Sequence, residues 1–203
     1  INQKNNKNDV KQHNSNQKYS DKDVNNSLKH VTQSENPPAM KNVTIIGDSL
    51  LKGLKSKGLS SEQHNVRIRY EGGAQTDDLQ YYVKPALKRK PDMIVLHCAT
   101  NDFTPGCNIK SYKELKNVAK LVKETLPECK LAFSSIIRRG DIDVEKKAED
   151  LNLKLEKFCK SQDHFFINNE NIDLSCLSGG KLHLNKKGNS IFANNLLDLL
   201  KKC

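Results

Sequence analysis

Short apolar runs alternate with amphipathic patterns of helical period from Lys41 to the end of the chain. The runs have the length and β-branched content of buried strands, and they cover residues 43–46, 65–70, 92–98, 131–137 and 165–167. The helical patterns cover residues 50–59, 76–90, 111–126, 144–159 and 186–201. Such alternation is typical of βαβ units, in which helices cover both faces of a parallel sheet. The sequence therefore predicts an α/β fold, a three-layer α/β/α sandwich around a five-stranded parallel sheet.

Two of these elements carry more specific signals. In the second apolar run, Arg67 and Arg69 alternate with apolar residues, and a strand with one less buried face is expected at an edge of the sheet. Thr76 is the first residue of the second helical pattern and is expected to cap the helix. Pro85 lies inside the same pattern and is expected to kink or divide that helix.

Residues 1–38 differ in composition from the rest of the chain. They are rich in Asn, Lys, Gln, Ser and Asp, and their few apolar residues form no periodic stripe. Such a segment buries too little apolar surface to offset the conformational entropy that ordering removes. The sequence therefore predicts a disordered tail or linker over residues 1–38 and one folded domain over residues 39–203.

The 203-residue chain has a formal net charge of +10. This charge favours an acidic partner such as nucleic acid or an anionic membrane, although basic surfaces also serve solubility. The six cysteines show neither close pairs nor metal-ligand spacing, which favours reduced thiols and indicates neither a metal nor another cofactor. No run reaches the ~18 apolar residues of a membrane span, and the N-terminus lacks a secretory pattern. A soluble cytoplasmic protein is expected, and the start at Ile1 leaves room for an upstream segment.

The first apolar run ends abruptly in Gly47-Asp48-Ser49. Gly47 permits a sharp turn, so Ser49 is expected at the start of the next helix, where free backbone N–H groups favour negative charge on a bound oxygen. Ligands of open α/β sheets bind outside the carboxyl ends of the strands. Ser49 is therefore a candidate nucleophile.

Four short blocks resemble, in order, those of the SGNH hydrolases, also called the GDSL esterase and lipase family. They are Gly47-Asp48-Ser49-Leu50, Gly73-Ala74-Gln75-Thr76, Ala99-Thr100-Asn101-Asp102, and His183-Leu184-Asn185 with Gly188 following. The resemblance covers roughly residues 41–202, and four ordered blocks are far more specific than one. It implies a flavodoxin-like strand order and a serine ester hydrolase. Residues 90–98 also resemble SGNH domains of LINE-type retrotransposon proteins.

The resemblance assigns a role to each block. Ser49 would attack an acyl carbon, and His183, in the loop before the last helix, would act as its base. The backbone N–H groups of Ser49 and Gly73 and the side-chain amide of Asn101 would form a three-donor oxyanion hole. Asp48 and Asp102 would support the site, with Asp102 bracing the loop of Asn101.

Two residues depart from the family pattern. Gly180 stands where the family places an Asp three residues before the histidine. Asp173, upstream in the same loop, is the candidate replacement, and the alternative is a Ser-His dyad supported by a backbone carbonyl. Ala99 stands where the third block usually has Gly, and this departure is expected to be mild.

Two functions follow from these observations. The first is an esterase that acts on short acyl esters of lipid or carbohydrate. The second is a weak or inactive SGNH-fold binding module of a mobile-element protein that acts on nucleic acid or membrane, as the charge and Gly180 favour. His97 is expected to be a core residue, and the sequence leaves the oligomeric state open.

Overall fold

The computed structural model describes residues 39–107 and 110–203, so the predicted tail over residues 1–38 lies outside the described residues. Five parallel strands form one sheet in the order β2-β1-β3-β4-β5. Their bounds are β1 Lys41–Gly47, β2 His64–Tyr70, β3 Met93–His97, β4 Lys130–Ser134 and β5 Phe165–Ile167. The order is the predicted flavodoxin-like one, and β2 is an edge strand as expected.

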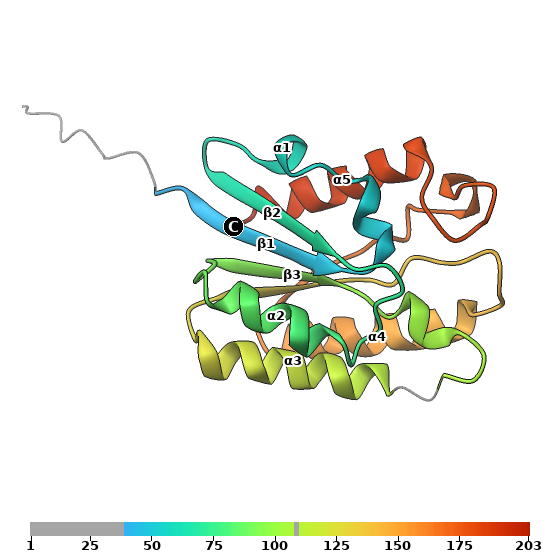
Figure 1. Ribbon diagram of the computed structural model, residues 1–203, viewed down its shortest axis with the longest axis horizontal. Helices are drawn as coiled ribbons and strands as arrows, with labels where there is room; N and C mark the ends of the chain where they lie inside the picture. The colour runs from blue at the N-terminus through green and yellow to red at the C-terminus, as the bar shows by residue number, and fades with distance from the viewer. Residues whose placement is uncertain (1–38, 108–109) are drawn as a thin grey trace, which may run out of the picture. The chain divides into compact units, whose positions relative to one another are not determined.

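Helices cover both faces of this sheet, so the predicted three-layer sandwich is confirmed (Figure 1). The α-helices are α1 Ser56–Leu59, α2 Leu79–Leu87, α3 Ser111–Thr125, α4 Glu145–Ser161 and α5 Lys186–Leu200. Short 3-10 helices are η1 Ser49–Gly53, η2 Thr100–Phe103 and η3 Leu174–Cys176. Helices α2, α3 and α4 pack on one face, and η1, α1 and α5 pack on the other.

The central strand β1 shows why this sequence forms a sheet buried on both faces. Val43 and Ile45 pack with α5, while Ile46 packs with α2 and α3 on the opposite face. All three are at most 1% exposed. Burying a side chain of this size contributes about 1.5–3 kcal/mol, so a polar residue at any of these positions would destabilise the sheet.

Helix α2 begins later than predicted and is not divided at Pro85. Thr76 does not cap it: the helix begins after Asp78, and the Thr76 side chain bonds to Asp102 instead. Pro85 does not divide it, because the helix continues to Leu87. The N–H that proline lacks would have bonded the carbonyl of Tyr81. Both Tyr81 and Pro85 are exposed, so solvent can satisfy that carbonyl.

Strand β4 ends three residues earlier than predicted because its continuation bonds elsewhere. The backbone N–H of Ile136 donates to the Asn152 side chain of α4 at 2.7 Å, and the Asn152 amide donates to the Ile136 carbonyl at 3.1 Å.

All six cysteines lie in the described residues and are free thiols. Within residues 39–107 and 110–203, the helices are too short or too polar to cross a membrane.

Candidate active site

Ser49 lies at the carboxyl end of β1, as the first residue of η1. Gly47 is required there, because a Cβ at this position would lie 1.9 Å from the carbonyl oxygen of His97 in β3. Asp48 caps η1 by accepting the N–H of Leu50 at 3.0 Å. No acceptor among the described residues binds the N–H of Ser49, so this donor is available to a substrate.

The structure brings His183 to Ser49, 134 residues away in sequence. The Ser49 hydroxyl oxygen lies 3.4 Å from Nδ1 of His183. This separation is long for a hydrogen bond, and such bonds between catalytic groups commonly tighten only when substrate binds. The nucleophile and base predicted from the sequence are therefore adjacent.

A closed loop between η3 and α5 presents His183. Leu177 and Leu184 form an antiparallel bridge, and Ser178 donates its N–H to the His183 carbonyl at 2.7 Å. Asn185 closes the base of the loop, because its side-chain amide donates to the Leu177 carbonyl at 2.9 Å while its oxygen caps α5. These bonds fix the backbone on which the imidazole is carried.

Gly73 and Asn101 lie in the loops that follow β2 and β3. Gly73 has φ +76, which glycine adopts without strain, and none of the described residues accepts a hydrogen bond from its N–H. Asn101 donates from its side-chain amide to the Ala74 carbonyl at 2.8 Å. Because that amide carries two hydrogens, one remains for a developing oxyanion.

Asp102 braces the site differently from the local role predicted for it. Its carboxylate accepts the Thr76 N–H at 3.1 Å and the Thr76 hydroxyl at 2.5 Å. It thereby joins the loop after β3 to the loop after β2 across 26 positions in sequence. Burial raises the pKa of Asp102, while hydrogen bonds from Ser111 and Thr76 lower it.

Asp48 is a buried acid next to the nucleophile. It is 1% exposed, and its Oδ2 has no hydrogen-bond partner among the described residues. Burial raises the pKa of Asp48 to about 7, while the Leu50 N–H and, more weakly, the charge of Arg139 lower it. Asp48 therefore exchanges a proton near neutral pH, one residue from Ser49.

His97 is confirmed as a core residue. It is 1% exposed, its Nδ1 lies 3.0 Å from the Ser134 hydroxyl, and its ring packs on Phe192. Burial lowers the pKa of His97 to about 3, so the imidazole is neutral at physiological pH and faces the core.

The hydrogen bonds of the Asp173 carboxylate go to a residue other than His183. The Asp173 carboxylate caps η3 and accepts the Ser175 N–H at 2.8 Å and the Ser175 hydroxyl at 2.5 Å. These bonds lower the pKa of Asp173. In the part of the chain that the structure describes, no hydrogen bond joins this carboxylate to His183. The arrangement is that of a Ser-His pair, and Asp173 as its acid stays a prediction.

The departure at Ala99 is larger than expected from the sequence. Ala99 has φ +109, in a region that side chains rarely adopt, and it is completely buried. The Cβ of alanine makes this conformation strained by roughly 1–3 kcal/mol. Glycine would adopt this conformation without that strain.

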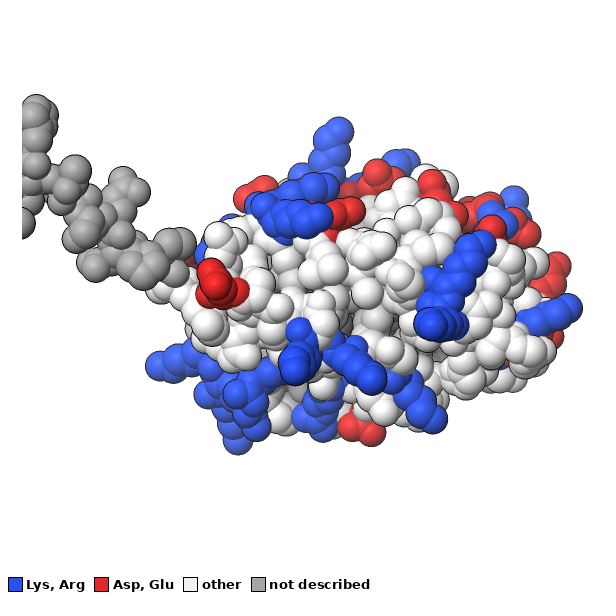
Figure 2. Space-filling view, turned by 90° about the horizontal axis from the view of Figure 1, so that it is seen from above, with Lys and Arg blue, Asp and Glu red and all other residues white. Residues whose placement is uncertain are grey.

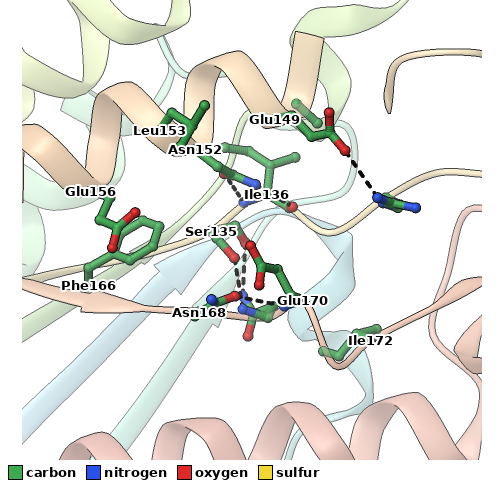
Figure 3. Close-up of a pocket in the computed structure, with 13 residues that line it drawn as sticks. Ser135, Ile136, Glu149, Asn152, Leu153, Glu156, Phe166, Asn168, Glu170 and Ile172 are labelled. Carbon is green, nitrogen blue, oxygen red and sulfur yellow. Dashed lines mark hydrogen bonds and ion pairs between the residues drawn. The ribbon is translucent and has the colours of Figure 1, made fainter. Parts of the chain in front are cut away.

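A cavity of about 490 Å³ lies apart from these residues, between α4 and the segments that follow β4 and β5 (Figure 3). Ser135, Asn152 and Asn169 contribute polar side chains to it, and Ser49, Asn101 and His183 do not line it. Among the described residues, no group of three or more His, Cys, Asp or Glu side chains could hold a metal ion.

Comparison with known proteins gives the fold. No family model matches the sequence, and no curated protein matches it significantly. Solved structures do match. A GDSL-like lipase from Bacteroides thetaiotaomicron has a TM-score of 0.67 and 18% identity, over 80% of this chain and 88% of the lipase. A lipase/acylhydrolase from Enterococcus faecalis has a TM-score of 0.65 and 17% identity, over 80% and 96% of the two chains.

A third match is a family 3 carbohydrate esterase from Talaromyces cellulolyticus, with a TM-score of 0.65 and 17% identity over 80% of this chain and 97% of the esterase. At identities this low, the likeness establishes the fold alone. The chain therefore has the α/β fold of the GDSL-type, or SGNH, hydrolases, with the strand order that the sequence predicted.

Proposed function

We propose that the chain is a serine ester hydrolase whose nucleophile is Ser49 and whose base is His183. The 3.4 Å approach of the two side chains at the carboxyl end of β1 carries this proposal. The unengaged N–H groups of Ser49 and Gly73 support it, because an oxyanion hole needs donors without another acceptor. The fold shared with lipases and esterases is consistent with the same chemistry.

The reaction would proceed in two halves. Ser49 Oγ attacks the acyl carbon while Nδ1 of His183 takes the hydroxyl proton, and the carbonyl oxygen becomes negative at the N–H groups of Ser49 and Gly73 and the Asn101 amide. The ester bond breaks, and His183 returns the proton to the leaving alcohol. Water, deprotonated by His183, then attacks the acyl-serine, which releases the acid and regenerates Ser49.

The imidazole would work without a carboxylate partner. Asp173 is engaged by Ser175, and Gly180 has no side chain to offer. A Ser-His dyad keeps the proton transfer and the oxyanion hole but loses the charge that stabilises the imidazolium. Removing that charge from a serine protease costs about 10⁴ in kcat, so slow turnover is expected.

Short acyl groups suit this site best. Ser49 is half-buried, while Gly73 and His183 are exposed, so the nucleophile lies near the surface. Such an open site accepts acetyl or other short acyl esters of lipid or carbohydrate without a deep acyl pocket.

Hydrolysis of p-nitrophenyl acetate by the purified chain tests the proposal. Ser49→Ala and His183→Ala should each abolish the enzymatic rate, and the double variant should be no slower, because the pair acts as a unit. Ser190→Ala is the matched control, since Ser190 is an exposed serine of α5. Full activity in Ser49→Ala would refute the proposed nucleophile.

One observation favours the alternative, a nucleic-acid-binding module. Arg67, Arg69 and Arg89 line a groove of about 440 Å³ between the edge strand β2 and α2. Of these three arginines, only Arg69 has an ion-pair partner among the described residues, which is Glu71 at 3.8 Å. The exposed ring of Tyr81 on α2 could stack on a base. Figure 2 shows Lys and Arg side chains grouped along the lower left of its view, where acidic side chains are few.

Binding of a fluorescent single-stranded RNA tests this second function. Arg67→Gln with Arg89→Gln should weaken binding and flatten its salt dependence, because fewer counterions are released. Arg138→Gln, which removes a charge paired with Glu145 and Glu149 on α4, is the control. Binding to anionic vesicles but not to RNA would favour a membrane partner instead. The likeness to LINE-type proteins remains a prediction from residues 90–98.

A further inference from the structure

The turn Arg139–Asp141, between β4 and α4, contacts the loops that carry the active-site residues. The Arg139 side chain is 8% exposed. Its Nη1 donates to the Thr100 carbonyl at 3.2 Å, and Thr100 directly precedes Asn101. The remaining bonds of the guanidinium go to both carboxylate oxygens of Asp141, from Nε at 2.9 Å and from Nη2 at 2.6 Å. A planar, bidentate pair of this kind fixes the direction in which the third donor points.

The same turn holds the loop of His183. The Gly140 N–H donates to the Lys181 carbonyl at 2.8 Å. The approach is close: a Cβ at Gly140 would lie 3.1 Å from the Lys181 side chain and 3.2 Å from that of Leu174. Lys181 itself has φ +52, a strained conformation for a lysine. It is held from both sides, because its N–H also donates to the Ser178 carbonyl at 2.8 Å.

The turn is well placed to fix these loops because the chain before it is anchored. Asn152 of α4 binds both backbone groups of Ile136, as Figure 3 shows. The neighbouring Arg138 forms ion pairs with Glu145 at 2.7 Å and Glu149 at 3.1 Å on the same helix, but its side chain is 48% exposed, so these pairs add little to the anchoring. The turn therefore rests on α4, an element that carries none of the proposed catalytic groups. The charge of Arg139 also acts on Asp48, beside Ser49, since the Arg139 guanidinium lowers the pKa of the Asp48 carboxyl.

We propose that Arg139 is a positioning residue that, through the turn Arg139–Asp141, sets the placement of Asn101 relative to His183. The inference rests on the proposed hydrolase function. A misplacement of about 1 Å among reacting groups can cost roughly a hundredfold in rate, so the bond to Thr100 can matter although Arg139 touches no reacting atom. The sequence does not reveal this role, because the Thr100 carbonyl that Arg139 binds lies 39 positions away.

An alternative role for Arg139 is a surface ion pair with Asp141. Exposed pairs contribute little to stability, and loss of such a pair would leave the kinetics unchanged. Arg138 offers a matched control, because it is the neighbouring arginine, is paired with glutamates and has a side chain 48% exposed. The kinetic effect of Arg139→Gln must therefore be compared with that of Arg138→Gln in the full chain.

Arg139→Gln and Arg139→Lys are expected to lower kcat about tenfold to a hundredfold, with KM within about twofold, because the loops move while the surface open to substrate remains. Arg139→Lys should lose as much kcat as Arg139→Gln, since lysine cannot make the bidentate pair and the third bond together. In Arg139→Ala, added guanidinium ion should restore part of kcat. Arg138→Gln should behave as the wild type. Unchanged kcat in Arg139→Gln, or an equal loss in Arg138→Gln, would overturn the proposal.

Amide hydrogen exchange separates failure of this inference from failure of the hydrolase assignment. A wild-type chain that neither hydrolyses esters nor reacts at Ser49 with a fluorophosphonate probe would refute the proposed function. In that case the amides of Thr104 and Lys181, which are bonded within the two loops, should still exchange faster in Arg139→Gln than in Arg138→Gln. Equal exchange in the two variants would show that Arg139 positions neither loop.

Discussion

Asp102 accepts two hydrogen bonds from Thr76, at 3.1 Å from its N–H and at 2.5 Å from its hydroxyl. The bonds cross from the loop after β3 to the loop after β2, so the segments that carry Asn101 and Gly73 are fixed to each other. A second tie, from the Asn101 amide to the Ala74 carbonyl, joins the same loops. Two of the three proposed oxyanion donors thus belong to one hydrogen-bonded unit.

Asn101→Ala should lower kcat by about 10²–10³, with little change in KM, because an oxyanion contact strengthens only in the transition state. Steady-state kinetics on p-nitrophenyl acetate measure both constants. Since Asn101 also bonds Ala74, its removal loosens the loop of Gly73, and thermal unfolding should be measured in parallel. An effect confined to KM would reassign Asn101 to substrate binding.

Ala99→Gly should stabilise the chain by about 1 kcal/mol, because glycine removes the strain at φ +109. The gain is smaller than the strain itself, since glycine also increases the conformational entropy of the unfolded chain. Urea unfolding measures the change in the free energy of unfolding. Ala132→Gly, at an equally buried alanine inside β4, is the control and should destabilise. A loss of stability in both variants would contradict the claim that the backbone of Ala99 is strained.

The pH dependence of stability should contain two opposing contributions. The folded-state pKa of His97 is lowered to about 3 by burial, so its contribution is present above its unfolded pKa of 6.5 and is lost as pH falls toward 3. The folded-state pKa of Asp48 is raised to about 7, so its contribution is present below the unfolded pKa of 3.8 and is lost as pH rises toward 7. Between 3.8 and 6.5, folding releases a proton from His97 and takes one up at Asp48.

Single variants should expose each contribution. In His97→Gln, the free energy of unfolding should fall as pH rises through this window, by up to about 1.4 kcal/mol per pH unit. In Asp48→Asn it should rise with pH by a similar amount, while the wild type changes less than either variant. Urea unfolding at several pH values gives the three slopes. Identical slopes in all three proteins would show that neither group is buried in its stated protonation state.

Much of the architecture was predictable because its signals are local. β5 has its predicted bounds, and α3 and α5 lie within one residue of theirs. Short blocks singled out Ser49 and His183, since the chemistry restricts their residue types, and the two side chains lie 3.4 Å apart; their catalytic roles stay a prediction. Thr76 was misassigned as a cap because its hydroxyl binds Asp102, 26 positions later in the chain, and no local pattern indicates such a distant partner. The positioning role proposed for Arg139 carried no sequence signal because the Thr100 carbonyl that it binds lies 39 positions away. The backbone strain at Ala99 is a property of the folded chain alone.

Two positions before His183, Asp173 and Gly180, can be used to test whether a carboxylate orients its imidazole. Asp173→Asn should lower kcat by less than tenfold, because that carboxylate is bonded to Ser175. A loss on the scale of about 10³–10⁴ would instead make Asp173 the acid of a triad. Steady-state kinetics on p-nitrophenyl acetate measure kcat for both proteins.

Gly180→Asp gives the complementary test, because it places an acid where the resembling family carries one. The substitution is sterically allowed: a Cβ at Gly180 would meet no atom of the described chain within 4 Å, and its φ is not positive. If the loop directs that side chain to the imidazole, the acid stabilises the imidazolium and kcat should rise several-fold. Gly180→Asn, which matches the shape without the charge, is the control and should leave kcat near the wild-type value. An equal change in both variants would mean that the negative charge does not reach His183.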